Sequence, residues 1–451
     1  MKVIKFGGTS LATADQIKKA CSIVLSDEER RLVVVSAPGK RFKEDTKVTD
    51  LLIKCAKNHI KNGNDEGIIT EIVERYSEIA DGLGLKGDIV DRIKEDIYSR
   101  VPKQIDNKNK FLDSMKAAGE DNAAKIFAEY LKSLGVQAKY INPKDAGLML
   151  SDEFGNARVL PESYNNLKKL KEMAGILVFP GFFGYSSKGE VVTFPRGGSD
   201  ITGSILAVAV KAEVYENFTD VDSVFAADPN VVHNPQPISN ITYREMRELS
   251  YGGFSVLHEE TLEPVYRTNI PVNIKNTDNP EASGTLISNN REITNGPVVG
   301  ISSDDGFCCL FVGKYMLNRE VGFGRKILQF LEEENLAYEH MPSGIDSISI
   351  ILREKQLTKE KEGRLMDKLK RELALDDISL KRNLTLIMIV GEGMFNAVGV
   401  AARAIGSIAN AKINIEMINQ GSSEISMMFS VKSTDEKNAV RALYKEFFNS
   451  L

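Results

Sequence analysis

The sequence predicts an α/β protein in which a three-layer αβα domain with a mainly parallel sheet precedes two ferredoxin-like βαββαβ modules. Three observations support this prediction. Short β-branched runs alternate with amphipathic stretches through residues 1–295, as they do in parallel sheets covered by helices. A polar, turn-rich stretch interrupts this pattern at residues 289–297. The residues that follow contain an internal repeat.

The predicted sheet is built from six runs, each apolar enough to be buried on both faces. These runs are Val3–Phe6, Leu32–Val35, Gln137–Ile141, Ile176–Phe179, Val214–Phe218 and Val272–Ile274. After the first run, Thr13-Ala14-Asp15-Gln16 has the form of a capping box, so we expect a helix to begin there. Residues 66–98 also have helical periodicity, and we expect an inserted helical segment without catalytic spacing.

The C-terminal third contains a duplication. A constant shift of 77 positions lays Val321–Ser349 over Val398–Ser426 without gaps. Each copy has the order strand, helix, two strands, helix that is typical of a ferredoxin-like unit. We therefore predict three domains, at residues 1–295, 296–382 and 383–451. Such small units leave a sheet face and edge uncovered, so we expect a homodimer at least, and whether dimers pair into tetramers stays open.

The composition argues against several classes of function. The 451 residues carry 58 basic and 63 acidic side chains, for a net charge of −5, so we expect no surface for nucleic acid. No run approaches the roughly 20 apolar residues that a membrane span requires, and the N-terminus has no export signal. The four cysteines lack metal-binding spacing, and we expect them to be reduced. These features predict a soluble, cytoplasmic protein with no metal site of its own.

The first chemical motif lies at the end of the first strand. Gly7-Gly8-Thr9-Ser10 follows the strand directly, and Lys5 lies within it. Two glycines let the backbone approach a phosphate, N–H groups near a helix start favour anions, and a lysine adds a point charge. The segment is therefore a candidate phosphate cradle. It is not a Walker A loop, because the lysine precedes the glycines, and taken alone it fits an ordinary tight turn at least as well.

A second glycine-rich corner joins the β-like run Val191–Phe194 to an apolar helix expected at Ile201–Val210. This corner is Arg196-Gly197-Gly198-Ser199-Asp200. Its guanidinium can bind a carboxylate through two hydrogen bonds, and its aspartate can orient a lysine or hold a metal. The alternative is that Ser199 or Asp200 merely caps the helix. Two basic Gly-Gly corners in one domain favour a binding site over two caps.

Together these motifs resemble those of aspartate kinases. The resemblance rests on Lys5-Phe6-Gly7-Gly8-Thr9-Ser10, Arg196-Gly197-Gly198-Ser199-Asp200 and Thr219-Asp220-Val221, and it covers essentially the whole chain. The duplicated tail is similar to the paired ACT domains of that family, most clearly at Asn419-Gln420-Gly421-Ser422-Ser423-Glu424. The resemblance implies an amino-acid-kinase-type fold for the αβα domain. It also implies that ATP, with Mg²⁺, phosphorylates the β-carboxylate of L-aspartate.

Roles for individual residues follow from the same resemblance. Lys5 and Asp200 are the candidate catalytic residues, because Lys5 would bridge the ATP phosphates and Asp200 would keep it in place. The nucleotide would contact Lys5, Gly7, Gly8, Ser10, Thr219, Asp220, Phe225 and Asn230. The amino-acid substrate would contact Thr49, Glu120, Phe182, Arg196 and Ser199.

Phosphoryl transfer to a carboxylate requires residues of these types. A carboxylate acceptor is already ionised at neutral pH, so the reaction needs cations and N–H donors and no general base. Arg196 would bind the α-carboxylate of the substrate, and Glu120 would accept from its α-ammonium group. The two contacts together distinguish an amino acid from a simple diacid.

The sequence departs from the family pattern near the nucleotide. Phe225 and Asn230 stand where many members have Tyr and Arg, and Ser255 stands where they have Lys. Phe225 can still pack on a base, but two cationic partners of ATP are missing. These departures leave the adenine and ribose contacts open, while the phosphate and aspartate contacts follow the family pattern.

An effector site is predicted in the first repeat. Family resemblance implies contacts at Gly322, Phe323 and Gly324, and in the segment that carries Tyr338, Glu339, Ser343 and Asp346. N–H donors suit the carboxylate of an amino acid, and acidic oxygens suit its ammonium groups. Two acids suit an effector with a second ammonium, which favours lysine over threonine. The alternative is a turn with solvated acids.

The leading interpretation is therefore an aspartate kinase in the first step of lysine, threonine and methionine biosynthesis, inhibited by lysine. One alternative is a kinase of another carboxylic amino acid such as glutamate. Another is a non-catalytic amino-acid sensor, which the missing cations near the nucleotide motivate.

Overall fold

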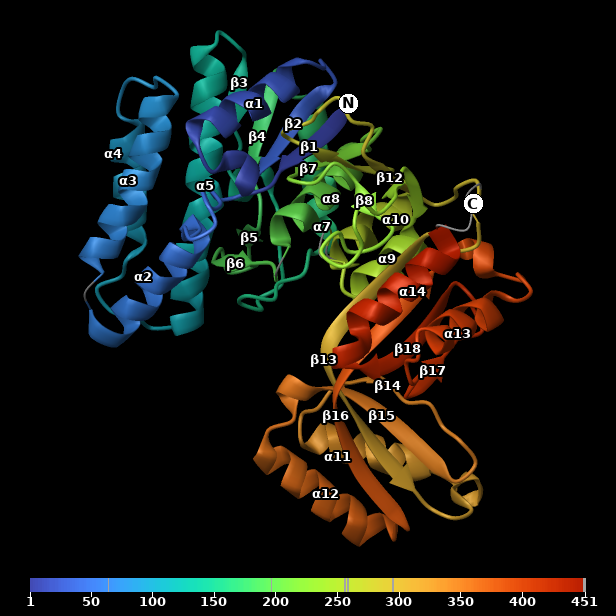
Figure 1. Ribbon diagram of the computed structural model, residues 1–451. Helices are drawn as coiled ribbons and strands as arrows, with labels where there is room; N and C mark the ends of the chain where they lie inside the picture. Colours follow the sequence, from blue (N-terminus) through green and yellow to red (C-terminus); the bar gives the residue numbers. More distant parts are fainter. Residues whose placement is uncertain (64, 196, 255–256, 258, 294–295, 449–451) are drawn as a thin grey trace. The chain divides into compact units, whose positions relative to one another are not determined.

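The computed structural model describes residues 1–63, 65–195, 197–254, 257, 259–293 and 296–448. The chain divides into two compact units (Figure 1). Unit 1 comprises residues 1–224, 237–247 and 255–291, and unit 2 comprises residues 225–236, 248–254 and 292–451. None of the helices within the described ranges is long and apolar enough to cross a membrane.

Unit 1 alternates strands with helices. Its strands are β1 (Lys2–Phe6), β2 (Arg30–Val35), β3 (Ala138–Tyr140), β4 (Ile176–Pro180), β5 (Phe183–Tyr185), β6 (Val191–Thr193), β7 (Tyr215–Thr219), β10 (Asn240–Thr242), β11 (Val272–Asn276) and β12 (Thr285–Ser288). Its helices are α1 (Ala14–Leu25), α2 (Val48–Asn62), α3 (Glu66–Gly82), α4 (Ile89–Arg100), α5 (Lys108–Ser133), α6 (Pro143–Ala146), α7 (Pro161–Leu167), α8 (Gly198–Val210) and α10 (Glu263–Thr268). The chain passes between the units at β8 (Val224–Phe225), β9 (Pro237–Ile238) and α9 (Tyr243–Tyr251).

Eight strands of unit 1 form one sheet in the order β10-β12-β11-β7-β1-β2-β4-β3. All neighbouring strands are parallel except the antiparallel pair of β11 and β12, which confirms the predicted mainly parallel sheet. The six predicted strands all form. One expectation about them is wrong, because β3 lies at the edge of the sheet and is only partly buried. An edge strand has a neighbour on one side only, so it does not need two apolar faces.

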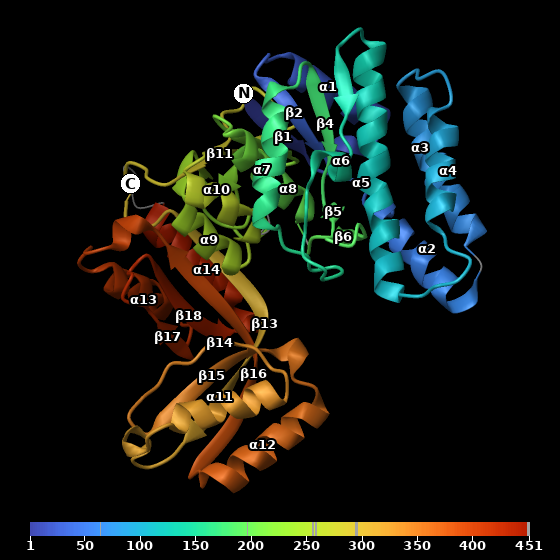
Figure 2. The same cartoon turned by 180° about the vertical axis from the view of Figure 1, so that it is seen from behind.

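Helices cover both faces of this sheet, as the views from opposite sides show (Figures 1 and 2). Side chains alternate between the faces along a strand. In β1, Ile4 and Phe6 pack into the core made with α1, α2, α3, α4 and α5. Val3 and Lys5 therefore point to the other face, where α8 packs against β1 and β2. The predicted three layers are confirmed.

Local signals explain where helices start and stop. The Thr13 hydroxyl accepts a hydrogen bond from the Gln16 N–H at 3.3 Å, so Thr13 caps the start of α1. The reciprocal half of the predicted capping box is not among the described contacts, because Gln16 Nε2 donates to Asp278 and Gln16 Oε1 has no partner there. The helical segment predicted at 66–98 forms an antiparallel pair of helices, α3 and α4, beside α2 and α5 (Figure 1). Gly84 and Gly87 separate them, with φ of 68° and 118° that favour glycine.

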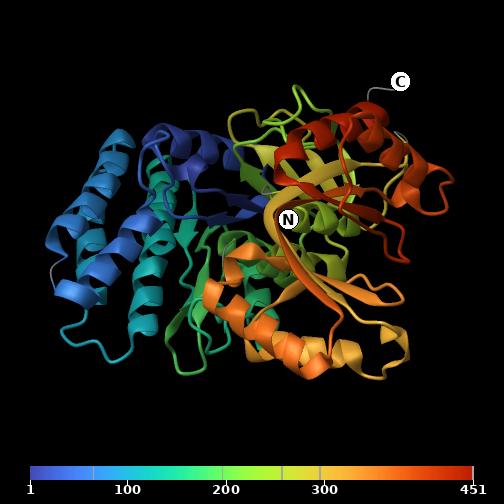
Figure 3. The same cartoon turned by 60° about the horizontal axis from the view of Figure 1, so that its bottom comes forward.

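Unit 2 contains a six-stranded antiparallel sheet in the order β14-β15-β13-β16-β18-β17. Figure 3 shows its two long central strands. The strands are β13 (Gly300–Gly313), β14 (Tyr338–His340), β15 (Ser347–Arg353), β16 (Asp377–Val390), β17 (Met417–Asn419) and β18 (Ser426–Lys432). The helices are α11 (Phe323–Glu333), α12 (Lys359–Leu373), α13 (Val400–Asn410) and α14 (Glu436–Phe448).

The two repeats share this sheet. The C-terminal half of β13 pairs with β15, and its N-terminal half pairs with Leu386–Val390 beside β18. The start of β13 therefore supplies a strand to the second repeat although it precedes the first. The boundary expected between residues 382 and 383 falls inside β16.

Candidate active site

The predicted site residues of unit 1 follow the carboxyl ends of its parallel strands. Gly7 follows β1, Phe182 follows β4, and Thr219 ends β7. The order of the strands reverses at β1, since β2, β4 and β3 lie on one side of it and β7 and β11 on the other. In open α/β sheets, ligands bind at the carboxyl edge where the strand order reverses. The topology therefore places the site at the end of β1.

Lys5 lies at the centre of this site and is 6% exposed. Its Nζ is 2.5 Å from Oδ1 of Asp200 in the first turn of α8 and 3.3 Å from Oδ1 of Asn217 in β7. Asn217 in turn donates to Asp200 Oδ1 at 2.8 Å. The two glycine-rich corners thus meet at one ammonium group, as the sequence predicts. Asn217 was not predicted, although a buried amide in the apolar run Val214–Phe218 was a usable signal.

The first corner is closely packed. The Gly7 N–H donates to the Phe218 carbonyl at 3.0 Å. A Cβ on Gly8 would lie 2.9 Å from the Ala37 carbonyl oxygen, so only glycine fits there. The Gly39 N–H donates to the Gly8 carbonyl at 2.8 Å. The backbone after β2 therefore forms one wall of the corner, a contact that was not predicted.

Ser10 connects this corner to another strand end. Its hydroxyl lies 2.7 Å from the hydroxyl of Thr277, which follows β11 directly. The Thr277 N–H donates to the Thr219 carbonyl at 2.9 Å. The Thr219 hydroxyl donates to Asp220 at 3.1 Å. Thr277 is a second residue that sequence analysis missed, and its place after a predicted strand was the signal.

The second corner contains unusual backbone geometry. Gly197 precedes α8 with φ of 82°, and Phe182 has φ of 73°, which is rare for a bulky side chain. The Phe182 N–H donates to the Thr202 hydroxyl at 3.0 Å, which holds this conformation. Strained backbone of this kind is concentrated at ligand sites. Ser199 is 8% exposed beside it, whereas Arg196 and Ser255 lie outside the described residues.

Glu120 of α5 is a buried carboxylate with 5% exposure. One oxygen is buried without a hydrogen-bond partner among the described residues, and the Ala37 N–H donates to the carboxylate. Burial raises the pKa of Glu120 to about 8. A cation that entered the site would therefore find an acceptor that lacks a partner. Thr49 lies in the first turn of α2, which begins right after the loop that carries Gly39.

The structure does not place every predicted nucleotide contact with these residues. Phe225 and Asn230 belong to unit 2, whereas the site described here belongs to unit 1. Both nitrogens of Asn230 donate to the Asp228 carboxylate, at 2.8 and 2.9 Å. Their contact with a nucleotide stays a prediction.

The described acidic side chains of unit 1 form no metal site by themselves. Within the described ranges, no group of three or more His, Cys, Asp or Glu side chains is placed to bind an ion. Asp200 already contacts Lys5, and Asp220 accepts from Thr219. A Mg²⁺ ion at this site would take most of its ligands from phosphates and water, as it usually does with nucleotides.

The predicted effector residues all belong to unit 2, but the two acids lie apart, because Asp346 precedes the start of β15 and Glu339 bonds Arg353 at its end. Gly322 starts α11 with φ of 80°, and Phe323 is buried. A Cβ on Gly324 would lie 3.9 Å from the Met341 methyl group, so the start of α11 adjoins the segment after β14. Tyr338, Ser343 and Asp346 of that region are exposed.

The two predicted effector acids already have partners in the protein. Glu339 accepts from Arg353 Nε at 3.2 Å and from the Tyr251 hydroxyl at 2.6 Å. Asp346 accepts from the Met316 N–H at 2.8 Å. Of the two, Asp346 is the one open to solvent, so it is better placed to meet a soluble ligand.

Comparison with known proteins agrees with this geometry. Residues 1–276 match the amino acid kinase family, and residues 387–447 match the ACT domain. Aspartokinase 3 of Bacillus subtilis (strain 168) is 54% identical over 448 residues, which cover 99% of each chain. The chain belongs to the aspartokinase family. It is therefore a phosphotransferase, and the predicted fold class and enzyme class are confirmed.

Solved structures of aspartokinases have the same fold. The Clostridium acetobutylicum aspartate kinase superimposes with a TM-score of 0.88 at 38% identity, over 99% of this chain and 100% of that one. Escherichia coli aspartokinase III in complex with aspartate and ADP gives a TM-score of 0.80 at 27% identity, over 99% and 100%. The same enzyme in complex with lysine and aspartate gives 0.79 at 26% identity, over 99% of each chain.

Proposed function

We propose that the chain transfers the γ-phosphoryl group of ATP to the β-carboxylate of L-aspartate, giving ADP and 4-phospho-L-aspartate. The observation that carries this proposal is the buried ammonium of Lys5, held 2.5 Å from Asp200 where the two glycine-rich corners meet. The aspartate and ADP bound to the Escherichia coli enzyme support the same substrates here. The product would enter lysine, threonine and methionine biosynthesis in the cytoplasm.

The site suits a reaction that depends on charge neutralisation. Phosphoryl transfer passes through a state in which negative charge spreads over the phosphate oxygens, and positioned cations and N–H groups stabilise it. Lys5 supplies the cation, and Gly7 has no side chain to crowd it, since a Cβ there would lie 3.7 Å from Lys5 Nζ. Mg²⁺ would supply further positive charge between the phosphates. The acceptor carboxylate is ionised at neutral pH and needs no base.

The acceptor side suits an amino acid. The unpartnered oxygen of Glu120 is an acceptor for the α-ammonium group. Arg196 would bind the α-carboxylate through two hydrogen bonds, and Ser199, Thr49 and Phe182 would complete the pocket. Thr219 and Asp220 would contact the nucleotide, and Phe225 and Asn230 stay predicted contacts of it.

Regulation and assembly follow from unit 2. We propose that lysine inhibits the enzyme by binding at the start of α11 and at Asp346. The lysine bound to the Escherichia coli enzyme supports this effector. We also propose a homodimer through the two ACT repeats, at 296–382 and 383–451, of which the second is completed by the start of β13.

Measuring ADP release with aspartate, glutamate and N-acetylglutamate as acceptors tests the proposal. We expect turnover with aspartate only, and Lys5→Ala should abolish it. Faster turnover with glutamate would contradict the choice of substrate. Negligible turnover in the unaltered chain, unchanged by Lys5→Ala while lysine still binds, would identify a sensor in place of an enzyme.

A further inference from the structure

Helix α3 contacts both sides of the proposed active site, although it carries none of the predicted site residues. Arg75 and Tyr76 are neighbours on this helix, and their side chains are 3% and 1% exposed. Arg75 Nη2 donates to the Gly39 carbonyl at 2.8 Å, and the Tyr76 hydroxyl donates to the Gly119 carbonyl at 2.8 Å. Two adjacent polar groups of one helix thus bind the backbone of two separate segments.

The Arg75 contact fixes one wall of the first glycine-rich corner, Gly7–Ser10, which we call the phosphate corner. A Cβ on Gly39 would lie 2.6 Å from the Gly8 carbonyl carbon, so the two glycines touch. Arg75 Nη1 also binds the Asp45 carboxylate at 2.5 Å, and Arg41 binds the same carboxylate. The guanidinium therefore ties together both ends of the loop between β2 and α2. A single planar group with several donors is well suited to hold two acceptors at a fixed separation.

The Tyr76 contact fixes the turn of α5 that carries Glu120. Gly119 is packed so tightly that a Cβ there would lie 2.7 Å from the Ala37 Cβ. The Ala37 N–H donates to the Glu120 carboxylate. A shift of the Gly119 turn would therefore move this carboxylate against its donor.

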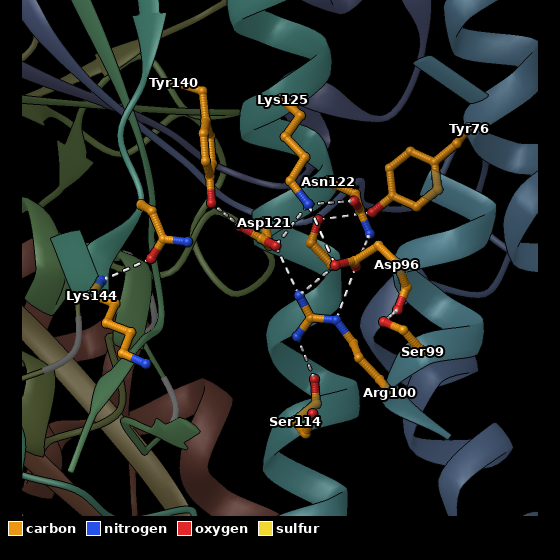
Figure 4. Close-up of polar contacts among 12 residues, drawn as sticks. Tyr76, Asp96, Ser99, Arg100, Ser114, Asp121, Asn122, Lys125, Tyr140 and Lys144 are labelled. Carbon is orange, nitrogen blue, oxygen red and sulfur yellow. Dashed lines mark hydrogen bonds and ion pairs between the residues drawn. The ribbon is translucent and has the colours of Figure 1, made fainter. Parts of the chain in front are cut away.

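A charged cluster beside these contacts keeps the helices in place (Figure 4). Arg100 of α4 donates to Asp121 of α5 at 2.8 Å and to the Ser114 carbonyl at 2.9 Å. Lys125 of α5 lies 3.0 Å from Asp121. Figure 4 shows the Tyr76 hydroxyl pointing toward α5 beside Asn122 of this cluster. The cluster thus anchors α4 to α5, and through Asp121 it adjoins the turn of α5 that Tyr76 contacts.

We propose that Arg75 and Tyr76 are positioning residues for phosphoryl transfer, Arg75 acting on the phosphate corner through Gly39 and Tyr76 acting on Glu120 through Gly119. This inference rests on the proposed function, since it needs Glu120 to bind the substrate and Gly8 to adjoin the nucleotide. Neither residue touches a substrate. The inserted helical segment is in this view a support that sets the two halves of the site independently.

The two contacts predict that each variant raises the KM for a different substrate. Tyr76→Phe removes one oxygen and should raise the KM for aspartate roughly threefold to tenfold, the equivalent of one lost hydrogen bond, while the KM for ATP changes less than about twofold. Arg75→Lys cannot reproduce the two-acceptor fork and should raise the KM for ATP by a similar factor. Thermal midpoints are measured alongside.

Two controls separate positioning from plain stability. Tyr98→Phe loses a hydroxyl of α4 that makes a solvent-exposed hydrogen bond to Glu66, and it should leave both KM values unchanged. Arg100→Lys weakens the charged cluster between α4 and α5. It should lower the thermal midpoint without changing the KM for aspartate more than the KM for ATP, or the reverse. If Arg75→Lys does not fold, Asp45→Ala, which removes one of its two acceptors, is measured instead with the same expectation.

Several results would overturn the inference. It fails if Tyr76→Phe leaves the KM for aspartate within about twofold of the unaltered chain, or if Arg100→Lys changes both KM values as much as the α3 variants do. Failure of the proposed function looks different, because the unaltered chain would then release no ADP in the presence of aspartate.

Discussion

The ammonium of Lys5 and the carboxylate of Asp200 form an ion pair of 2.5 Å in which the side chains are only 8% and 18% exposed. The two residues come from different glycine-rich corners, one at the end of β1 and one at the start of α8. Removing one member of a buried pair leaves the other charge without compensation, which is costly. Asp200 therefore fixes where the Lys5 charge lies before a nucleotide binds.

Asp200→Asn should lower kcat by roughly 10²-fold, the effect expected when a preorganised charge loses its position. The KM for aspartate should change much less, because Asn keeps the side-chain volume. Steady-state ADP release measures both. Asp27→Asn is the matched control, since Asp27 pairs with Lys2 of the same strand at 2.8 Å outside the site. Equal losses in the two variants would show that the Lys5 pair has no special role.

The sequence predicts those parts of the site that are encoded by short local patterns. Lys5, Gly7 and Gly8 follow one another around a strand end, and Ser199 and Asp200 open one helix. Each pattern combines a strand, a glycine turn and a helix start, so its chemistry can be read without knowing what packs beside it. These residues were predicted, and the structure brings them together.

Residues whose role depends on strand order were missed. Asn217 is 212 positions from Lys5, and Thr277 is 267 positions from Ser10. They become neighbours because β7 lies beside β1 and β11 beside β7. A single sequence contains no local signal for this order. The shared strands of unit 2 have the same cause, because β13 joins the second repeat through non-local pairing.

The buried carboxyl of Glu120 should make stability depend on pH. Its pKa is about 8 in the folded chain, raised by burial from an ordinary value of 4.5. Between these values the folded chain keeps a proton that the unfolded chain releases, so the stability from this group falls as pH rises through the window. Glu120→Gln cannot ionise. It should therefore gain stability over the unaltered chain, by roughly 2–4 kcal/mol at pH 8.5 and little at pH 5.

Denaturant unfolding at the two pH values measures this difference. Glu129→Gln, at a partly exposed position on the same helix, is the control and should show no gain in stability at high pH.

The Glu120 carboxyl should also release a proton when the substrate binds, because pairing with the substrate ammonium requires its ionised form. Aspartate binding at pH 7 should release a proton, detected by calorimetry in buffers of different ionisation enthalpy. The proton release should vanish in Glu120→Gln.

Gly8→Ala should damage the phosphate corner with little effect on the fold elsewhere. The new Cβ would lie 2.9 Å from the Ala37 oxygen and 3.3 Å from the Gly39 Cα, and backbone atoms cannot move aside as a side chain can. We expect kcat/KM for ATP to fall at least about tenfold. Gly67→Ala is the control, since nothing lies within 4 Å of its Cβ in α3. It should leave the kinetics intact and stabilise the chain by about 0.5–1 kcal/mol. Similar kinetics in both variants would show that the packing of Gly8 against Ala37 and Gly39 does not matter for ATP binding or turnover.

Asp346 should be needed for inhibition by lysine. Its exposed carboxylate accepts only one backbone hydrogen bond among the described contacts, from Met316, so an oxygen is open to a second ammonium group. Asp346→Asn should raise the half-inhibitory lysine concentration about tenfold or more, which is the cost of a charge-assisted hydrogen bond. Asp376→Asn is a close control, because Asp376 accepts from the neighbouring Tyr315 N–H at 2.6 Å and is also exposed. Lysine titrated against aspartate-dependent ADP release measures both variants. A shift of the same size in Asp376→Asn would assign the effect to loosening of the 315–316 turn, and no shift in Asp346→Asn would place the effector elsewhere.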